Sequence, residues 1–517
     1  MSAFKKLASD TALYGVSTIL GRMLYWFMVF LHTRVFPRPG ELSSNVELFS
    51  YVPVLLLVYT LSLETAFFRY ASRQKEDKQK VFNETLSIVL AVSLVATALI
   101  ALFSPQIATA LNYPGQQKFI IWVAMIVATD AIVSIPFARL RVENQARQFV
   151  KAKLISIVVN IFLNVFFLVI CPQIYNGEYL LFLQPVVDLF YDPSVGPGYI
   201  FLANLIANLV YFPLLWKTFG GFRFQLDRPQ VRLLLAYSFP LMLTALAGNI
   251  NTLTDRWFLR PLLPDGFYPG LTSEDALGIY GNCYKLSVFM ALAIQSFKFA
   301  ADPFFFSRAE DKNAPGLLAD VNKWFVIVCV IIWVGISLNL DWIGLFIGKT
   351  YRQGLSVVPL LLLANLVLGV YYNISFWFKL SDKTAYGTFI TALGAAVTVL
   401  LNVLLIPVMG YMGCAVAYLA SSVVMCVTCY LLGEKHYPVP YDVSSALIYL
   451  FSGGLLIYLA SQIEISNLWI SVPYHLVLFV LYVGTMLVIE RRTFVPLLAK
   501  VRNRGGMKKE PRITNTE

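Results

Sequence analysis

The chain has 517 residues, of which 58% are hydrophobic and 13% are charged, and its net charge at pH 7 is +11. Soluble domains carry about 25% charged residues, so this composition excludes an ordinary soluble domain and indicates a membrane protein. The positive charge does not require a nucleic-acid partner, because the distribution of Lys and Arg explains it as a signal of membrane topology.

Apolar runs of about 20 residues recur along the chain, and a helix of that length crosses a hydrocarbon core of about 30 Å. Membrane-spanning β-strands would instead appear as alternating segments of about ten residues. We therefore predict an all-α polytopic membrane protein with about fourteen transmembrane helices. The predicted spans are 11–36, 47–69, 84–103, 117–138, 152–171, 198–217, 232–256, 275–298, 322–343, 354–378, 385–407, 412–433, 443–462 and 469–490.

Basic residues are concentrated in alternate connections. Clusters of Lys and Arg follow the second, fourth and sixth spans and recur in the tail 491–517, whereas the long connection 172–197 has none. The positive-inside rule places the clusters in the cytoplasm. We therefore expect both termini to be cytoplasmic and the connection 172–197, which is rich in aromatic and aliphatic residues, to form an interfacial hairpin on the opposite side.

The fifth and eleventh spans contain similar stretches, "IFLNVFFLVICP" and "VLLNVLLIPVMG", which place Asn164 and Asn402 at matching positions. Because six spans separate the copies, the two halves have the same orientation and are related by an axis along the membrane normal. We predict a first six-helix lobe in residues 1–220 and a second in 221–435. Two further helices in 436–490 and a basic cytoplasmic tail in 491–517 complete the chain.

The first span contains an arginine in the stretch "YGVSTILGRMLYWFMVF". Arg22 lies about 16 Å into the helix, where inserting it costs roughly 2.5–3.5 kcal/mol. We interpret its helix face as one wall of a polar cavity, and a buried ion pair with Glu64 is the alternative. That face combines small and polar residues at helical spacing, namely Thr11, Gly15, Thr18, Arg22, Tyr25, Val29 and His32.

The eighth span contains a second mid-membrane cation, Lys285. Desolvated cations that face a shared cavity attract an anion that must cross the membrane. An Arg guanidinium can bind two phosphate oxygens at once, and a Lys adds a point charge. We therefore predict an anion-binding cavity that includes Arg22, Tyr25, Asn249, Arg256 and Lys285.

Among the acidic residues within or beside the spans, Glu64, Asp130 and Asp255 are candidates for balancing charge inside the membrane. We expect them to balance nearby cations, with coupling to protons or sodium as the alternative, and Asp255 could form an interfacial ion pair with Arg256. Cys426 and Cys429 form a CxxC pair, but no second ligand pair accompanies it, so we expect inert buried thiols. We predict no catalytic residues, no metal and no cofactor.

The sequence resembles the polysaccharide-biosynthesis flippases of the multidrug/oligosaccharidyl-lipid/polysaccharide (MOP) exporter superfamily. The resemblance rests on the 6 + 6 + 2 pattern of spans, on "YSFPLMLTALAGNINTLTDRWFL" in the seventh span, and on "LGIYGNCYKLSVFMALAIQSFKFAADPFFF" in the eighth. It implies two lobes around a central cationic cavity, lined largely by the first, second, seventh and eighth helices.

The resemblance further implies a flippase of the bacterial inner membrane that works by alternating access. It would move undecaprenyl-diphosphate-linked oligosaccharides from the cytoplasmic to the periplasmic leaflet, for lipopolysaccharide, O-antigen or exopolysaccharide synthesis. Its partners would be the lipid substrate, the bilayer and the glycan polymerase or glycosyltransferases of the same pathway. A lipid II flippase and a multidrug antiporter remain alternatives, as does a membrane glycosyltransferase or polymerase, although the sequence shows no large extramembrane region with paired catalytic groups.

Overall fold

The computed structural model describes residues 26–71, 77–307, 313–381, 383–463 and 467–491, together with Gly21 and Ile465. Within these residues every regular element is helical. Thirteen helical segments are long and apolar enough to cross a membrane, and they match the last thirteen predicted spans. The first predicted span lies mostly outside the described residues, but its residues 26–35 are helical. The prediction of an all-α polytopic fold is therefore confirmed.

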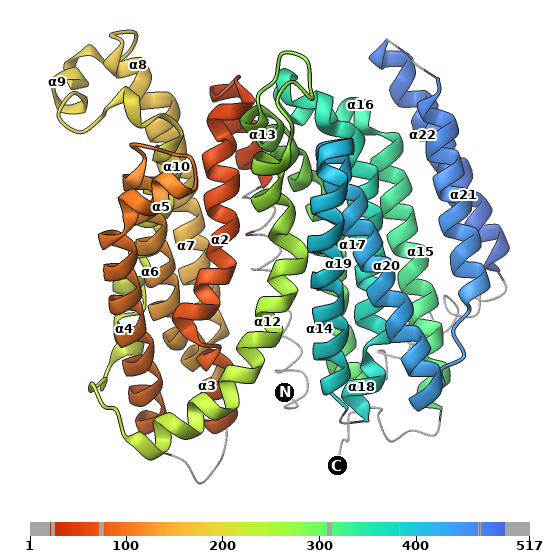
Figure 1. The fold of residues 1–517 in the computed structure, drawn as a ribbon, viewed down its shortest axis with the longest axis horizontal. Coiled ribbons are helices and arrows are strands. Elements are labelled where there is room, and N and C mark those ends of the chain that lie inside the picture. The colour runs from red at the N-terminus through yellow and green to blue at the C-terminus, as the bar shows by residue number, and fades with distance from the viewer. Residues whose placement is uncertain are drawn as a thin grey trace, which may run out of the picture.

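The helices gather into two groups, which we call the first and second lobes (Figure 1). The first lobe contains α2 (Ser43–Thr60), α3 (Leu63–Ala71), α4 (Lys78–Leu102), α5 (Ser104–Ala110), α6 (Gln117–Val142), α7 (Ala146–Val165), α8 (Cys171–Tyr175), α9 (Gln184–Val187), α10 (Tyr199–Leu209) and α11 (Tyr211–Leu214).

The second lobe begins with the long α12 (Arg228–Leu262), which rises between the two groups in Figure 1. It continues through α13 (Ser273–Tyr284), α14 (Val288–Ser307), α15 (Ala314–Leu338), α16 (Leu340–Ile343), α17 (Val358–Ile374), α18 (Phe376–Leu380), α19 (Ala385–Met409) and α20 (Tyr411–His436). The last two helices, α21 (Val443–Ser461) and α22 (Leu468–Ile489), pack along its outer edge.

Two predicted spans are interrupted in ways that hydropathy does not reveal. Leu61 and Ser62 adopt positive φ angles of 50° and 54° and separate α2 from α3. Such angles are rare for residues other than glycine. In the eighth span, a single 3₁₀ turn, Lys285–Ser287, separates α13 from α14. Lys285 therefore stands at a break between two helices rather than within one continuous helix.

Close packing joins the lobes at the end where α2 and α13 begin, which we call the interlobe seam. A Cβ atom at Gly278 would lie 1.9 Å from the carbonyl oxygen of Pro39, and one at Gly281 would lie 2.3 Å from the side chain of Val46. At Gly278 only glycine permits so close an approach to the Pro39 backbone. Glu47 and Arg260 form a buried ion pair of 3.4 Å across the seam, so the lobes are held together here by charge attraction as well as by packing.

One lysine of the second lobe contacts residues at the ends of both C-terminal helices. Lys323 of α15 lies 2.8 Å from Glu490, just after α22, and 3.2 Å from Asp442, just before α21. The Tyr449 hydroxyl also donates a 2.7 Å hydrogen bond to Glu490. These contacts hold both helices at one end of the lobe, so α21 and α22 form a peripheral addition.

The connection 172–197 consists of α8, α9 and short 3₁₀ turns that project from one end of the first lobe (Figure 1). Its apolar side chains Phe182 and Leu189 are 73% and 85% exposed. The ring of Phe190 stacks on Phe166, which in turn stacks on Phe162 of α7. The connection thus continues the apolar outer surface of α7, and its position at a membrane interface stays a prediction.

Candidate functional site

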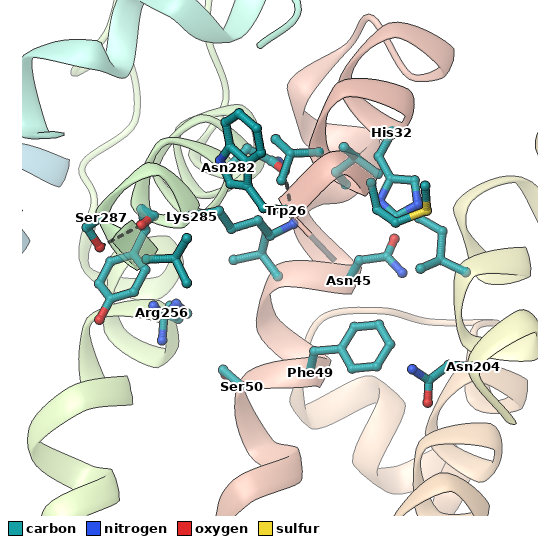
Figure 2. A pocket seen from close by; sticks show the side chains of 18 of the residues that line it. Trp26, His32, Asn45, Phe49, Ser50, Asn204, Arg256, Asn282, Lys285 and Ser287 are labelled. Carbon is teal, nitrogen blue, oxygen red and sulfur yellow. Dashed lines mark hydrogen bonds between the residues drawn. The ribbon is translucent and has the colours of Figure 1, made fainter. Parts of the chain in front are cut away.

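A cavity of about 590 Å³ lies between the two lobes. Side chains from residues 26–35, α2, α7 and α10 of the first lobe face side chains from α12, α13, α14 and α17 of the second (Figure 2). The described residues that line it are Trp26, Met28, Val29, His32, Leu42, Asn45, Val46, Phe49, Ser50, Asn160, Asn164, Ile200, Asn204, Leu253, Arg256, Gly281, Asn282, Tyr284, Lys285, Ser287, Val288, Ala291 and Asn365.

The second lobe supplies the cationic wall of the cavity. Lys285 is solvent-accessible although it lies in the middle of a span, and its Nζ donates a 3.1 Å hydrogen bond to Asn282 Oδ1. The Asn282 amide nitrogen donates to the Gly278 carbonyl one turn earlier at 2.9 Å, which aims its oxygen at the lysine. The Arg256 guanidinium lies 4.0 Å from the centre of the Tyr284 ring. Lys285 is thus held in place by a neighbour that carries no negative charge, whereas Arg256 also has the buried Asp255 carboxylate beside it.

The described lining contains no aspartate or glutamate. A carboxylate in the wall would neutralise Lys285 or Arg256 and would favour a cationic ligand. Without one, two cations face a water-accessible space between low-dielectric walls, where their field is focused. The cavity is therefore suited to an anion.

The first lobe supplies an uncharged polar wall. His32 Nε2 lies 2.9 Å from Asn164 Oδ1, and the Asn164 amide nitrogen donates to the carbonyl and side-chain oxygens of Asn160 at 2.9 and 2.6 Å. The i,i+4 spacing of the two asparagines on α7 brings their amides together. This network fixes the side chains at the upper part of the wall, where Figure 2 shows His32.

The predicted cavity residues fall into three groups. Lys285 and Arg256 line the cavity, whereas Asn249 is half-buried on α12 and is absent from the lining. Arg22 and Tyr25 lie outside the described residues, so their placement stays a prediction. The two described members nearest to them on the predicted polar face, Val29 and His32, both line the cavity.

None of the three predicted acidic residues lines the cavity. Glu64 forms an ion pair with Arg141, which lies in the last turn of α6. Among the described residues, the cation that it balances therefore lies at the end of a span and not in its middle. Asp130 accepts a 3.0 Å hydrogen bond from Asn208.

Asp255 is buried and accepts hydrogen bonds from the Tyr280 hydroxyl and from the backbone N–H of Arg256. No direct ion pair between the Asp255 and Arg256 side chains occurs among the described residues, but their charges attract each other, so the interfacial ion pair considered above stays a prediction. The guanidinium instead lies over an aromatic ring. Arg256 lines the cavity from this position.

Sequence reasoning missed most of the uncharged lining, including Trp26, Asn45, Phe49 and Asn204. Aromatic and amide side chains occur on many helices of this chain, and no spacing within one helix distinguishes these four. Asn164 was noted, but only as a marker of the internal repeat.

The cysteines offer no second site. All six are free thiols, including Cys426 and Cys429, and each is buried or half-buried. Across the described ranges, no group of three or more His, Cys, Asp or Glu side chains is arranged to hold a metal ion.

No family model and no curated protein matches the chain. Solved structures do match. The lipid II flippase MurJ, in an inward closed conformation, is 15% identical, with 93% of this chain and 99% of that chain covered and a TM-score of 0.70. An inward-facing multidrug resistance MATE family transporter of the MOP superfamily is 13% identical, with 80% and 94% covered and a TM-score of 0.57. A mutant of the MATE transporter VcmN of Vibrio cholerae is 14% identical, with 83% and 96% covered and a TM-score of 0.50.

At these identities the likeness concerns the fold. The likeness to MurJ covers 93% of this chain, whereas the likeness to the inward-facing MATE transporter covers 80%. The chain therefore has the membrane-transporter fold that the lipid II flippase MurJ shares with MATE transporters of the MOP superfamily.

Proposed function

We propose that this chain is a flippase that carries undecaprenyl-diphosphate-linked oligosaccharides from the cytoplasmic to the periplasmic leaflet of a bacterial inner membrane. The observation that carries the proposal is the interlobe cavity, whose described lining presents Lys285 and Arg256 without any carboxylate. The diphosphate would bind at these two cations, with Arg22 contributing from the first helix. The exported glycan would serve lipopolysaccharide, O-antigen or exopolysaccharide synthesis.

Transport would proceed by alternating access. The interlobe seam closes one end of the molecule through Gly278, Gly281 and the Glu47–Arg260 pair, and the substrate would enter from the other end, where the Lys and Arg clusters indicate the cytoplasm. Opening of the seam would then release the lipid-linked glycan outward. In this scheme the protein moves its substrate without chemical change, and both termini stay cytoplasmic.

A lipid II flippase is the second candidate, favoured by the similarity in fold between 93% of this chain and MurJ. Lipid II also carries a diphosphate, so the cationic wall suits both substrates. A multidrug antiporter fits less well, because cationic drugs require negative charge in a cavity and the described lining has none.

The direct test uses purified protein in proteoliposomes with a fluorescent undecaprenyl-diphosphate oligosaccharide. Dithionite added outside bleaches only outer-leaflet label, so flipping appears as a loss of protection over time. We expect flipping of the peptide-free oligosaccharide lipid, with fluorescent lipid II as the second arm. Transport of lipid II alone would establish the second candidate instead, and protection equal to that in protein-free liposomes in both arms would contradict both.

We predict that flipping follows the membrane potential. The diphosphate carries about two negative charges, and each charge that crosses the potential gains about 2.3 kcal/mol per 100 mV. Outward movement would therefore gain about 4.6 kcal/mol per 100 mV, or roughly a 2000-fold bias at equilibrium. Collapsing the potential with valinomycin and potassium, with proton and sodium gradients clamped, should abolish net transport. Unchanged transport would contradict the membrane potential as the driving force and would favour coupling to protons or sodium through Glu64 or Asp130.

A further inference from the structure

The first-lobe wall of the cavity contains buried polar atoms that lack partners. Asn45 of α2 is only 7% exposed, and its amide nitrogen donates a 3.2 Å hydrogen bond to the Pro197 carbonyl. Its Oδ1 has no hydrogen-bond partner within the described structure, and neither does the indole nitrogen of Trp26. Buried polar atoms are nearly always paired in proteins, so an unpaired acceptor and an unpaired donor beside one cavity are available to a bound molecule.

Asn204 extends this wall from a different helix. It is half-buried on α10 and lines the cavity, and its side chain makes no hydrogen bond within the part of the chain that the structure describes. Figure 2 shows Phe49 between Asn45 and Asn204 on one side of the cavity, with Lys285 and Arg256 on the other. Phe49 stacks on Phe201 with 4.8 Å between ring centres, which holds its ring in position.

This combination has the chemistry that recognises a sugar. The Asn204 amide offers two donors and an acceptor, Asn45 offers its Oδ1 as an acceptor, and the Trp26 indole offers a donor. Sugar hydroxyls can satisfy both kinds, while the C–H face of a sugar ring packs against an aromatic side chain such as Phe49. The wall has no charge of either sign near Asn45 and Asn204 in the described lining, so it would not select an ionised group.

We propose that Asn45, Phe49 and Asn204 form a sugar subsite that binds the uncharged, hydroxyl-rich or acetamido sugar next to the diphosphate. The proposal rests on the function proposed above, because it takes the diphosphate to occupy Lys285 and Arg256 on the opposite wall. The substrate then bridges the lobes, with its phosphates on the second lobe and its first sugar on the first lobe. The first lobe thus recognises the glycan, and the second lobe recognises the diphosphate of the lipid carrier.

The test compares two probes, undecaprenyl diphosphate and undecaprenyl-diphosphate-N-acetylglucosamine, by equilibrium binding to the purified full chain in detergent. Asn204→Ala removes an amide that bonds only to the sugar, so it should weaken binding of the glycosylated probe about 3- to 10-fold. It should leave binding of undecaprenyl diphosphate within about twofold. Lys285→Ala should weaken binding of both probes by the same factor.

Two further variants test whether the loss is specific to the sugar subsite. Phe49→Leu, which removes the ring but keeps an apolar side chain, should repeat the selective loss and covers a failure of Asn204→Ala to fold. Asn208→Ala removes an amide from the same helix one turn away, outside the cavity lining, and should not discriminate between the probes. Equal effects of Asn204→Ala on both probes, or no effect on either, would overturn the subsite. Failure of the unmodified protein to bind either probe would instead overturn the proposed function.

Discussion

Replacing Lys285 with alanine should slow flipping of the oligosaccharide lipid by at least tenfold and up to about 150-fold. The lysine is a solvent-accessible cation at mid-membrane, and a hydrogen bond to a charged group contributes about 1.5–3 kcal/mol. Its only described hydrogen bond is to Asn282, so its charge is available for the diphosphate. Initial rates in the dithionite assay measure the effect.

The matched control for this prediction is Lys298→Ala. Lys298 belongs to the same membrane-spanning segment, lies over the Tyr372 ring and is absent from the cavity lining, so its loss should leave the rate within about twofold. Lys285→Arg keeps the charge and should retain part of the activity. A normal rate for Lys285→Ala, with a normal melting temperature, would contradict the assignment of the diphosphate to this wall.

Locking the interlobe seam with a disulfide should stop transport almost completely. A Cβ at position 281 would lie 3.0 Å from the Val46 Cβ, which is about 0.5 Å short of the 3.5–4.5 Å that disulfides require, so a small separation of α2 and α13 admits the bond. In the double variant Val46→Cys/Gly281→Cys, oxidation would tie α2 to α13 and prevent the seam from opening. Flipping should fall at least tenfold on oxidation and return on reduction.

A second crosslink, within one lobe, distinguishes the effect of closing the seam from a general loss of activity caused by crosslinking. A Cβ at Gly248 of α12 would lie 3.8 Å from the Thr391 side chain of α19, and both helices belong to the second lobe. Oxidised Gly248→Cys/Thr391→Cys should therefore transport normally. The native cysteines are buried or half-buried and free, so the oxidant should not affect the unmodified protein. Full activity of the crosslinked seam variant would show that this end does not open during transport.

The sequence alone gives the number and order of the thirteen described spans, and it places their limits to within nine residues. Insertion of a helix into a bilayer depends on the hydropathy of a continuous run, which is a local property. The same reasoning identified Lys285 and Arg256, because a charge inside an apolar run is costly wherever the helix packs. It also identified the polar face of the first helix, since helical spacing alone brings Val29 and His32 to one side.

Only the tertiary structure decided which groups meet. The partner of Glu64 is Arg141, 77 residues away in the sequence, and the wall of Asn45, Phe49 and Asn204 combines α2 with α10. The rotation of each helix and the closeness of two lobes are set by side-chain packing, down to single glycines such as Gly278. Hydropathy does not depend on that rotation, so the uncharged half of the cavity appears only when the helices are assembled.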